Sequence, residues 1–258
     1  MAPRASTSSA AAPARSDKQL RLELADGRTT ALHVARWSLA HTRVRVVRLA
    51  EREQLVAWCA RTGCQDALVG GFYTRPAGEP LGELRLRGRA VAHIPFTAPW
   101  HATRACLHST AGALNIDRRD ALAYEPRGDL LQAGPLLVRG GKVICIDGED
   151  PEGFSAAAGQ FDSDITAKRH PRAAIGLAQD AVIAVVADGR SEDDAGLTLG
   201  ELARALADLG ADAAMNLDGG GSASLVCDGY LRNRPRERVG VELPGGRAVT
   251  TVIAFDTA

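Results

Sequence analysis

Apolar and polar residues alternate along the first part of the chain, a pattern typical of antiparallel strands with one buried face. The alternation begins at Leu20, stops at Asp26-Gly27 and resumes over residues 31–47. Because Asp-Gly between two alternating runs favours a tight turn, we expect a hairpin there. The spacing of apolar residues over 51–61 then predicts a helix, which a glycine follows.

One local pattern occurs twice: a helix ends near a glycine, and a short apolar strand then leads into a glycine turn. Residues 51–71 carry the first copy and residues 198–221 the second. The second helix opens with Thr198 and Glu201, which have the spacing of a capping box. We interpret the copies as a pseudo-duplicated unit, and a chance likeness between two helix–strand units is the alternative.

Strands outnumber helices along the rest of the chain. The almost wholly apolar run 181–187 predicts a central strand, and residues 239–243 and 249–255 are strand-like as well. No linker divides the chain, so residues 19–258 are expected to form one α+β domain with a mixed or antiparallel sheet core and a few helices. Residues 1–18 are rich in Ala, Ser and Pro, which predicts a disordered leader.

Charge and composition exclude several kinds of partner. Lys+Arg and Asp+Glu are both 31, and aromatic residues make up 4%, so a basic or base-stacking surface for nucleic acid is not expected. No apolar run approaches the length that spans a membrane. The five cysteines are scattered without a Cys-x-x-Cys pair, and the leader has no apolar segment of a secretory signal. These features favour reduced thiols and a cytoplasmic location, and they leave the oligomeric state open.

The most chemically suggestive stretch joins an apolar strand to Asn216-Leu217-Asp218 and three glycines. Side chains two residues apart on a strand share a face, so the amide of Asn216 and the carboxylate of Asp218 are expected to point the same way. The backbone of Gly219, Gly220 and Gly221 can turn sharply and present N–H groups to an anion. We therefore favour a functional site here over a plain tight turn.

Several further motifs accompany this turn along the chain. They are Gly70-Gly71-Phe72-Tyr73, Gln132-Ala133-Gly134-Pro135, Pro171-Arg172, Asp188-Gly189-Arg190, Gly196-Leu197-Thr198-Leu199 and Arg232-Asn233-Arg234-Pro235. In this order and spacing, together with residues 216–222, they resemble the phosphodiester glycosidase family. The resemblance runs from about Gln19 to the C-terminus and is densest over residues 170–235.

The resemblance implies hydrolysis of a sugar-1-phosphodiester between the sugar and the phosphate. The products would be a free sugar, N-acetylglucosamine or a related aminosugar, and a phosphomonoester. The Ala- and Arg-rich composition suggests a bacterial protein that acts in a biosynthetic pathway. Two alternatives stay open, a phosphodiesterase that cleaves the P–O bond on the same scaffold and a non-catalytic protein that binds sugar phosphates.

The residue types in these motifs suit that chemistry. Arg172 and Arg190 can stabilise a phosphate leaving group through bidentate contacts. Asp188 and Asp218 both follow predicted strands and are expected to face one pocket, where one of them activates water or stabilises an oxocarbenium-like centre. A buried structural ion pair between Arg172 and Asp188 is the alternative.

Other residues of the motifs are candidates for binding substrate. The set comprises Asn216 for sugar hydroxyls or water, the backbone of Gly219, Gly220, Gly221 and Gly71, Ser222 as a hydrogen-bonding hydroxyl rather than a nucleophile, and His170 as an acid or a phosphate contact. The sequence predicts no cofactor and no metal. A calcium site is weakly supported, because the acids Asp147, Glu149, Asp150, Asp162 and Asp164 match no loop with fixed ligand positions, and a solvated loop is favoured.

The chain departs from the family pattern at one position. The family usually has Asn directly before the Gly-Gly-Phe turn, where this chain has Val69. If that Asn binds substrate in relatives, we expect a less polar pocket wall here.

Overall fold

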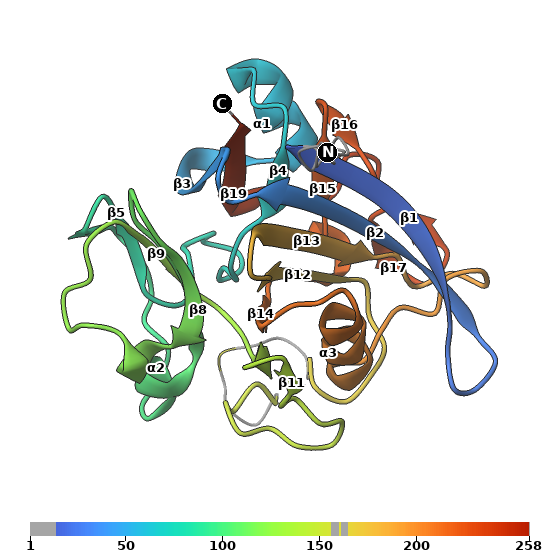
Figure 1. Ribbon diagram of the computed structural model, residues 1–258. Coiled ribbons are helices and arrows are strands. Elements are labelled where there is room, and N and C mark those ends of the chain that lie inside the picture. The colour runs from blue at the N-terminus through green and yellow to red at the C-terminus, as the bar shows by residue number, and fades with distance from the viewer. Residues whose placement is uncertain (1–13, 156–159, 161–164, 258) are drawn as a thin grey trace, which may run out of the picture.

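The computed structural model describes residues 14–155, 160 and 165–257. Most strands are antiparallel, and the described residues hold three α-helices (Figure 1). The predicted α+β domain, with a mainly antiparallel core and few helices, is confirmed. None of the helices in the described chain is long and apolar enough to cross a bilayer.

The largest sheet has seven strands in the order β1-β2-β13-β12-β14-β10-β11. Their bounds are β1 (Arg15–Glu23), β2 (Thr29–Ser38), β10 (Leu136–Arg139), β11 (Lys142–Val143), β12 (Arg172–Leu177), β13 (Ala181–Ala187) and β14 (Ala213–Asn216). The predicted hairpin is confirmed, since Glu23 pairs with Thr29 across the turn at Asp26-Gly27. Both β13 and β14 pair antiparallel with β12, so their carboxyl ends lie at the same edge of the sheet.

Two five-stranded sheets and a small hairpin complete the fold. One five-stranded sheet contains β3 (Thr42–Glu53), β4 (Ala67–Val69), β15 (Leu225–Cys227), β16 (Tyr230–Leu231) and β19 (Val249–Thr257). The other contains β5 (Leu84–Leu86), β6 (Arg89–Ala90), β7 (Ala105–Ser109), β8 (Leu114–Arg118) and β9 (Asp129–Gln132). The hairpin is formed by β17 (Arg236–Arg238) and β18 (Val241–Glu242). In Figure 1 the sheet with β5, β8 and β9 stands to one side of the other two.

Both predicted helix–strand–glycine units form. Helix α1 (Leu55–Thr62) is followed by Gly63 in the left-handed conformation and by β4. Helix α3 (Leu199–Asp208) has the full Thr198–Glu201 capping box and is followed by left-handed Gly210 and β14. Helix α2 (Trp100–Thr103) is a single turn.

Two segments differ from the sequence expectation. Residues 51–53 extend β3 instead of opening a helix, because Glu53 pairs with Val249 across the sheet. The ordered domain also begins before Gln19, since Arg15 already pairs with Trp37 in the β1–β2 ladder. In both cases tertiary pairing overrides the local preference.

Part of the expected solvated loop between Glu149 and Asp164 is buried. The Glu152 side chain accepts hydrogen bonds from the backbone N–H groups of Ala105 (3.1 Å) and Leu136 (2.7 Å). Phe154 packs against the guanidinium of Arg104, which lies 3.9 Å from the ring centroid. Asp162 and Asp164 lie outside the described residues.

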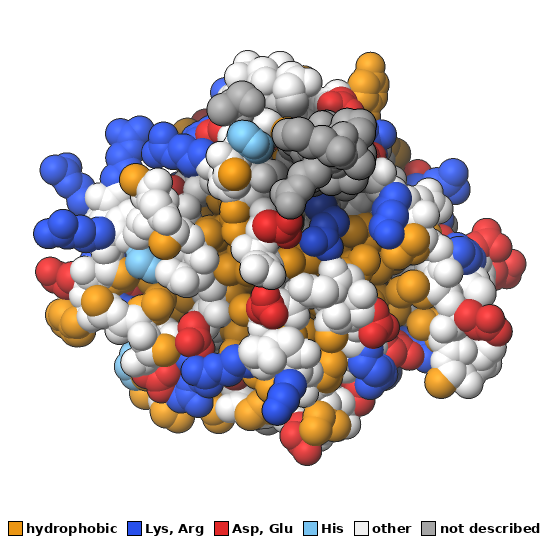
Figure 2. All heavy atoms as spheres, in the orientation of Figure 1, with side chains coloured by type: hydrophobic (Ala, Val, Ile, Leu, Met, Phe, Trp, Pro, Cys, Tyr) orange, Lys and Arg blue, Asp and Glu red, His pale blue; other side chains and the backbone are white. Residues whose placement is uncertain are grey.

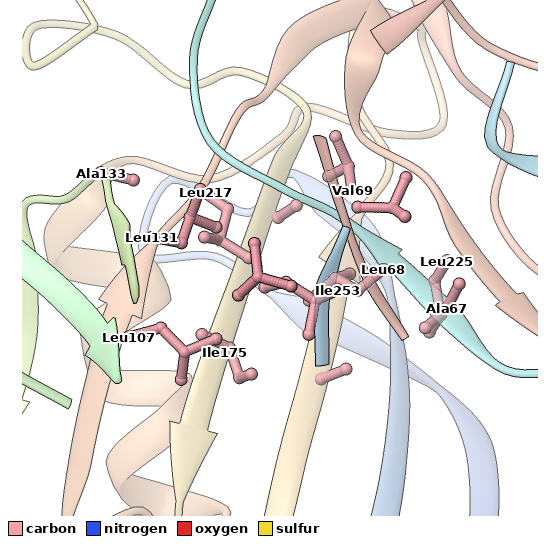
Figure 3. Packing of buried hydrophobic residues seen from close by; sticks show 14 of the residues in the cluster. Ala67, Leu68, Val69, Leu107, Leu131, Ala133, Ile175, Leu217, Leu225 and Ile253 are labelled. Carbon is pink, nitrogen blue, oxygen red and sulfur yellow. The ribbon is translucent and has the colours of Figure 1, made fainter. Parts of the chain in front are cut away.

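The core fills the space between the sheets, where Leu68, Val69, Leu217 and Ile253 approach one another (Figure 3). Val69 has no exposed surface and pairs with Val252. It therefore packs in the core and does not form the less polar pocket wall expected from the sequence. The two glycine turns meet beside this core, because the backbone N–H of Asp218 donates to the carbonyl of Gly70 (3.1 Å).

Candidate active site

A cavity of about 390 Å³ opens where the turn after β4, the start of β12 and the end of β14 meet. Its described lining is Phe72, Tyr73, Thr74, Arg75, Leu81, Ile94, Gln160, Ile165, His170, Pro171, Arg172, Arg190, Asn216, Leu217, Asp218, Gly219, Gly220 and Arg247. The cavity thus lies at the edge of the seven-stranded sheet where β12 begins and β14 ends.

Asp218 is the one acid among the described residues that line this cavity. Its Oδ1 accepts the backbone N–H of Gly219 (2.9 Å), and its Oδ2 is shielded from solvent without a hydrogen bond of normal geometry to a described residue. Burial raises the pKa of Asp218 to about 6, and the nearby Ser222 hydroxyl and Arg247 guanidinium oppose part of that rise. The carboxylate is therefore poised to exchange a proton near neutral pH.

Two more polar atoms beside the cavity are shielded and make no hydrogen bond of normal geometry to a described residue. The Asn216 amide donates to the carbonyls of Gly134 (3.0 Å) and Leu217 (2.9 Å), which leaves its Oδ1 as an unused acceptor. The Tyr73 hydroxyl is the other, and burial together with the charge of Asp218 raises its pKa. Since buried polar groups are nearly always hydrogen-bonded, these atoms are candidates to bind a polar ligand.

Four arginines line the same cavity: Arg75, Arg172, Arg190 and Arg247. The buried Arg172 guanidinium donates to the carbonyls of Leu197 (3.0 Å), Ile165 (2.8 Å) and Lys168 (2.9 Å). Arg190, in a left-handed conformation (φ 62°), donates to the carbonyls of Arg236 (3.1 Å) and Glu237 (2.5 Å). Guanidinium groups outnumber carboxylates in the described lining, and such a lining suits an anionic ligand.

Arg247 lines the cavity and also contacts the glycine turn. Its guanidinium donates to both oxygens of Glu237 (2.6 and 2.5 Å) and to the Ser222 hydroxyl (3.3 Å). A side chain at Gly221 would place its Cβ only 2.4 Å from a Glu237 oxygen, so Glu237 would have to move to admit one. The ion pair and the turn therefore hold Ser222 near Asp218.

Two of the three glycine N–H groups that the sequence suggested as free donors are used within the protein. The N–H of Gly219 donates to Asp218, and the N–H of Gly220 donates to the Pro171 carbonyl (2.8 Å). The turn forms a short 3₁₀ helix, η3 (Gly220–Ser222), at which the Ser222 N–H donates a hydrogen bond to the Gly219 carbonyl (3.1 Å). Positive charge for an anion thus comes from the arginines rather than from this backbone.

The structure also corrects the expectation that Asp188 and Asp218 face one pocket. Asp188 follows β13 at the expected sheet edge, but it is 3% exposed and absent from the cavity lining. Its Oδ2 contacts His33 Nε2 on β2 (2.8 Å), and its Oδ1 accepts the backbone N–H of Arg234 (2.8 Å). The carboxylate points to β2 rather than to β14 because these two partners bind both of its oxygens.

The remaining predicted residues divide into two groups. His170 lines the cavity, with its backbone bridged to Leu197. Ser222 and Gly71 lie behind the lining, where Ser222 is fully buried and the Gly71 N–H donates to the Thr251 hydroxyl (3.0 Å). Sequence reasoning missed Tyr73, Arg75 and Arg247 as cavity residues. Tyr73 belongs to a motif that the sequence pointed out, whereas no pattern distinguishes Arg75 or Arg247 from other surface arginines.

The described residues contain no group of three or more His, Cys, Asp or Glu side chains arranged to hold a metal ion. The cavity combines a shielded acid, two polar atoms without a hydrogen bond of normal geometry and several guanidinium groups. These features suit the binding of a polar, anionic small molecule.

Comparison with known proteins identifies the chain further. The model of the phosphodiester glycosidase family matches residues 62–255, so the chain belongs to this family. It is similar to the mouse N-acetylglucosamine-1-phosphodiester alpha-N-acetylglucosaminidase, with 30% identity over 193 residues. That alignment covers 68% of this chain and 34% of the mouse enzyme, so the chain spans about a third of that relative.

Solved structures show the same fold. The zebrafish N-acetylglucosamine-1-phosphodiester alpha-N-acetylglucosaminidase catalytic domain, auto-inhibited by its pro-peptide, has a TM-score of 0.71 at 20% identity. The match covers 99% of this chain and 87% of the zebrafish chain. A hypothetical protein from Synechocystis has a TM-score of 0.64 at 17% identity, over 95% of this chain and 62% of that one.

Proposed function

We propose that this chain hydrolyses a sugar-1-phosphodiester at the bond between the sugar C1 and the bridging oxygen. The observation that supports this most directly is the cavity itself, whose described lining includes four arginines and a single shielded carboxylate. A phosphodiester carries one negative charge, and its leaving group needs charge stabilisation more than protonation. The name of the mouse relative supports N-acetylglucosamine as the sugar.

Each group has a role that follows from its position. The arginines bind the phosphate and stabilise the charge that develops as the C1–O electron pair moves onto the bridging oxygen. Asp218 accepts a proton from the water that attacks C1, or it stabilises the positive charge at C1 before the attack. Asn216 Oδ1 and the Tyr73 hydroxyl are available to hydrogen-bond sugar hydroxyls or that water. The products are a free sugar and a phosphomonoester.

We place this reaction in the cytoplasm of a bacterium, where it would release a sugar in a biosynthetic pathway. The five cysteines support a reducing compartment, because each is a free thiol. Acidic and basic side chains are mixed over the face in Figure 2, which supports a small-molecule substrate over nucleic acid.

Hydrolysis of a phosphodiester of N-acetylglucosamine in oxygen-18 water tests which bond breaks. We expect the label in the free sugar, because the proposed attack is at C1, and mass spectrometry of both products detects it. Label in the phosphate would replace the proposal with P–O cleavage. Binding of the substrate without release of sugar by the wild type would instead indicate a sugar-phosphate binding protein.

The pH dependence of turnover reports on Asp218. If its ionised form is required, kcat/KM rises with pH through about 6 and levels off above that value, because burial raises the pKa of Asp218 to about 6. The phosphodiester stays a monoanion over this range and adds no step of its own. Initial rates between about pH 4.5 and pH 8 measure the profile, and a rate that falls as pH rises through this window would contradict the assignment.

A further inference from the structure

A second cavity, of about 620 Å³, adjoins the first. Its described lining is Asp26, Arg28, Ala167, Lys168, Arg169, Arg190, Ser191, Asp194, Ala195, Thr198 and Val239. Arg190 lines both cavities, so a molecule that contacts this side chain from the first cavity can continue into the second.

The two cavities are separated by a ridge formed by residues 165–170. Ile165 and His170 line the first cavity, whereas residues 167–169 line the second. Arg172 holds this ridge from below, because its guanidinium donates to the carbonyls of both Ile165 and Lys168. The ridge is therefore fixed to β12, the central strand that carries Arg172 into the site.

The second cavity has a surplus of positive charge. The Asp26 carboxylate is bound by Arg169 (2.6 Å) and Arg28 (2.9 Å), and Arg169 is also ion-paired with Glu201 (2.5 Å). Arg21 neutralises Asp194 (2.7 Å) in the same way. Among the described residues the exposed Lys168 makes no ion pair, so its amine and the Arg190 guanidinium are the charges left for a ligand.

The described lining of the first cavity encloses a small volume. Its volume lies near the lower end of the range of about 300–1,000 Å³ found for ligand sites, which fits one sugar with its phosphate. Because Arg190 lines both cavities, the group on the far side of the phosphate can extend past this side chain into the second cavity. Lys168 lines that second cavity.

On these grounds, and resting on the proposed function, we infer that the second cavity binds the aglycone of the phosphodiester and that Lys168 selects an aglycone with a second phosphoryl group. The preferred substrate class is then a sugar joined to a diphosphate, with the first phosphoryl group against the arginines and the second near Lys168. Hydrolysis at C1 would add water to the sugar and release the intact diphosphate.

Two probes separate this inference from the proposed function. UDP-N-acetylglucosamine carries a second phosphoryl group, whereas the methyl phosphodiester of N-acetylglucosamine-1-phosphate does not. In Lys168→Glu we expect the ratio of their kcat/KM values to fall about tenfold, mainly through a higher KM for the UDP compound. Lys142→Glu, an exposed charge reversal on β11 away from both cavities, is the matched control and should leave the ratio within about twofold.

The outcomes point to different failures. Suppose that the wild type turns over both probes. If Lys168→Glu then leaves the ratio of kcat/KM values unchanged, or if Lys142→Glu lowers it equally, the aglycone site is overturned while the proposed hydrolase activity stands. No release of sugar from either probe by the wild type overturns the proposed function and the inference with it. A preference for the UDP compound that weakens at about 0.5 M salt, where charges are screened within about 4 Å, supports Lys168.

Discussion

Asp218→Asn should lower kcat/KM by about 10³-fold while leaving the protein at least as stable as the wild type at pH 7. The loss of activity follows from removing the one acid among the described residues that line the cavity. The Asn side chain keeps an oxygen to accept the Gly219 N–H, so the turn is preserved. Initial rates on the methyl phosphodiester measure the first effect, and denaturant unfolding measures the second.

The stability effect has a definite sign and pH window. The folded pKa of Asp218 is raised from 3.8 to about 6, so the folded state binds more protons than the unfolded state between these values, and the wild type loses stability as pH rises through them. The variant avoids this loss, which amounts to up to about 3 kcal/mol in the free energy of unfolding. Asp180→Asn, on the exposed β12–β13 turn, is the control. A variant that keeps its activity would show that Asp218 is not catalytic.

Asp188→Ala should lower the free energy of unfolding by about 3 kcal/mol, because it leaves the buried His33 ring and the part-buried Arg234 N–H unsatisfied. His33 Nε2 and the Arg234 N–H both bind this carboxylate at 2.8 Å. For a chain of this length, the loss corresponds to a decrease of roughly 6–12 °C in Tm. Calorimetry or circular dichroism during heating measures it.

The same variant tests whether Asp188 acts in catalysis. Because its carboxylate binds His33 and Arg234 outside the cavity lining, we expect the folded variant to keep kcat within about tenfold at low temperature. Asp193→Ala, an exposed neighbour of the same loop, should change the unfolding free energy by less than about 0.5 kcal/mol. Loss of kcat as large as in Asp218→Asn, with an unchanged Tm, would return Asp188 to the role of catalytic partner that the sequence suggested.

Features determined by neighbours in the sequence were predicted well. The Thr198–Glu201 capping box and the Asp26-Gly27 hairpin depend on residues a few positions apart, and both form as expected. Asn216 and Asp218 were placed at the cavity because the alternation along a strand fixes their common face. The order of motifs also pointed to the family to which the chain belongs.

Features determined by distant pairing were not predicted. Whether Asp188 turns toward β14 or β2 depends on the hydrogen bonds that His33 and Arg234 offer, and both are far away in the sequence. Arg247 reaches the cavity only because the chain after β18 brings it against Glu237 and Ser222. A sequence pattern does not reveal such contacts. The sequence therefore predicted two arginines at the site, Arg172 and Arg190, and missed Arg75 and Arg247.

The hydrogen bond from the Asp218 N–H to the Gly70 carbonyl joins the glycine turns that follow strands of two different sheets. Its amide proton is thus a built-in reporter of whether those sheets remain docked. Exchange of that proton with deuterium requires the contact between the two glycine turns to open, and this opening also displaces the Asp218 carboxylate. The rate at which this one amide exchanges should therefore match the rate at which the site transiently loses its working geometry, well before the chain as a whole unfolds.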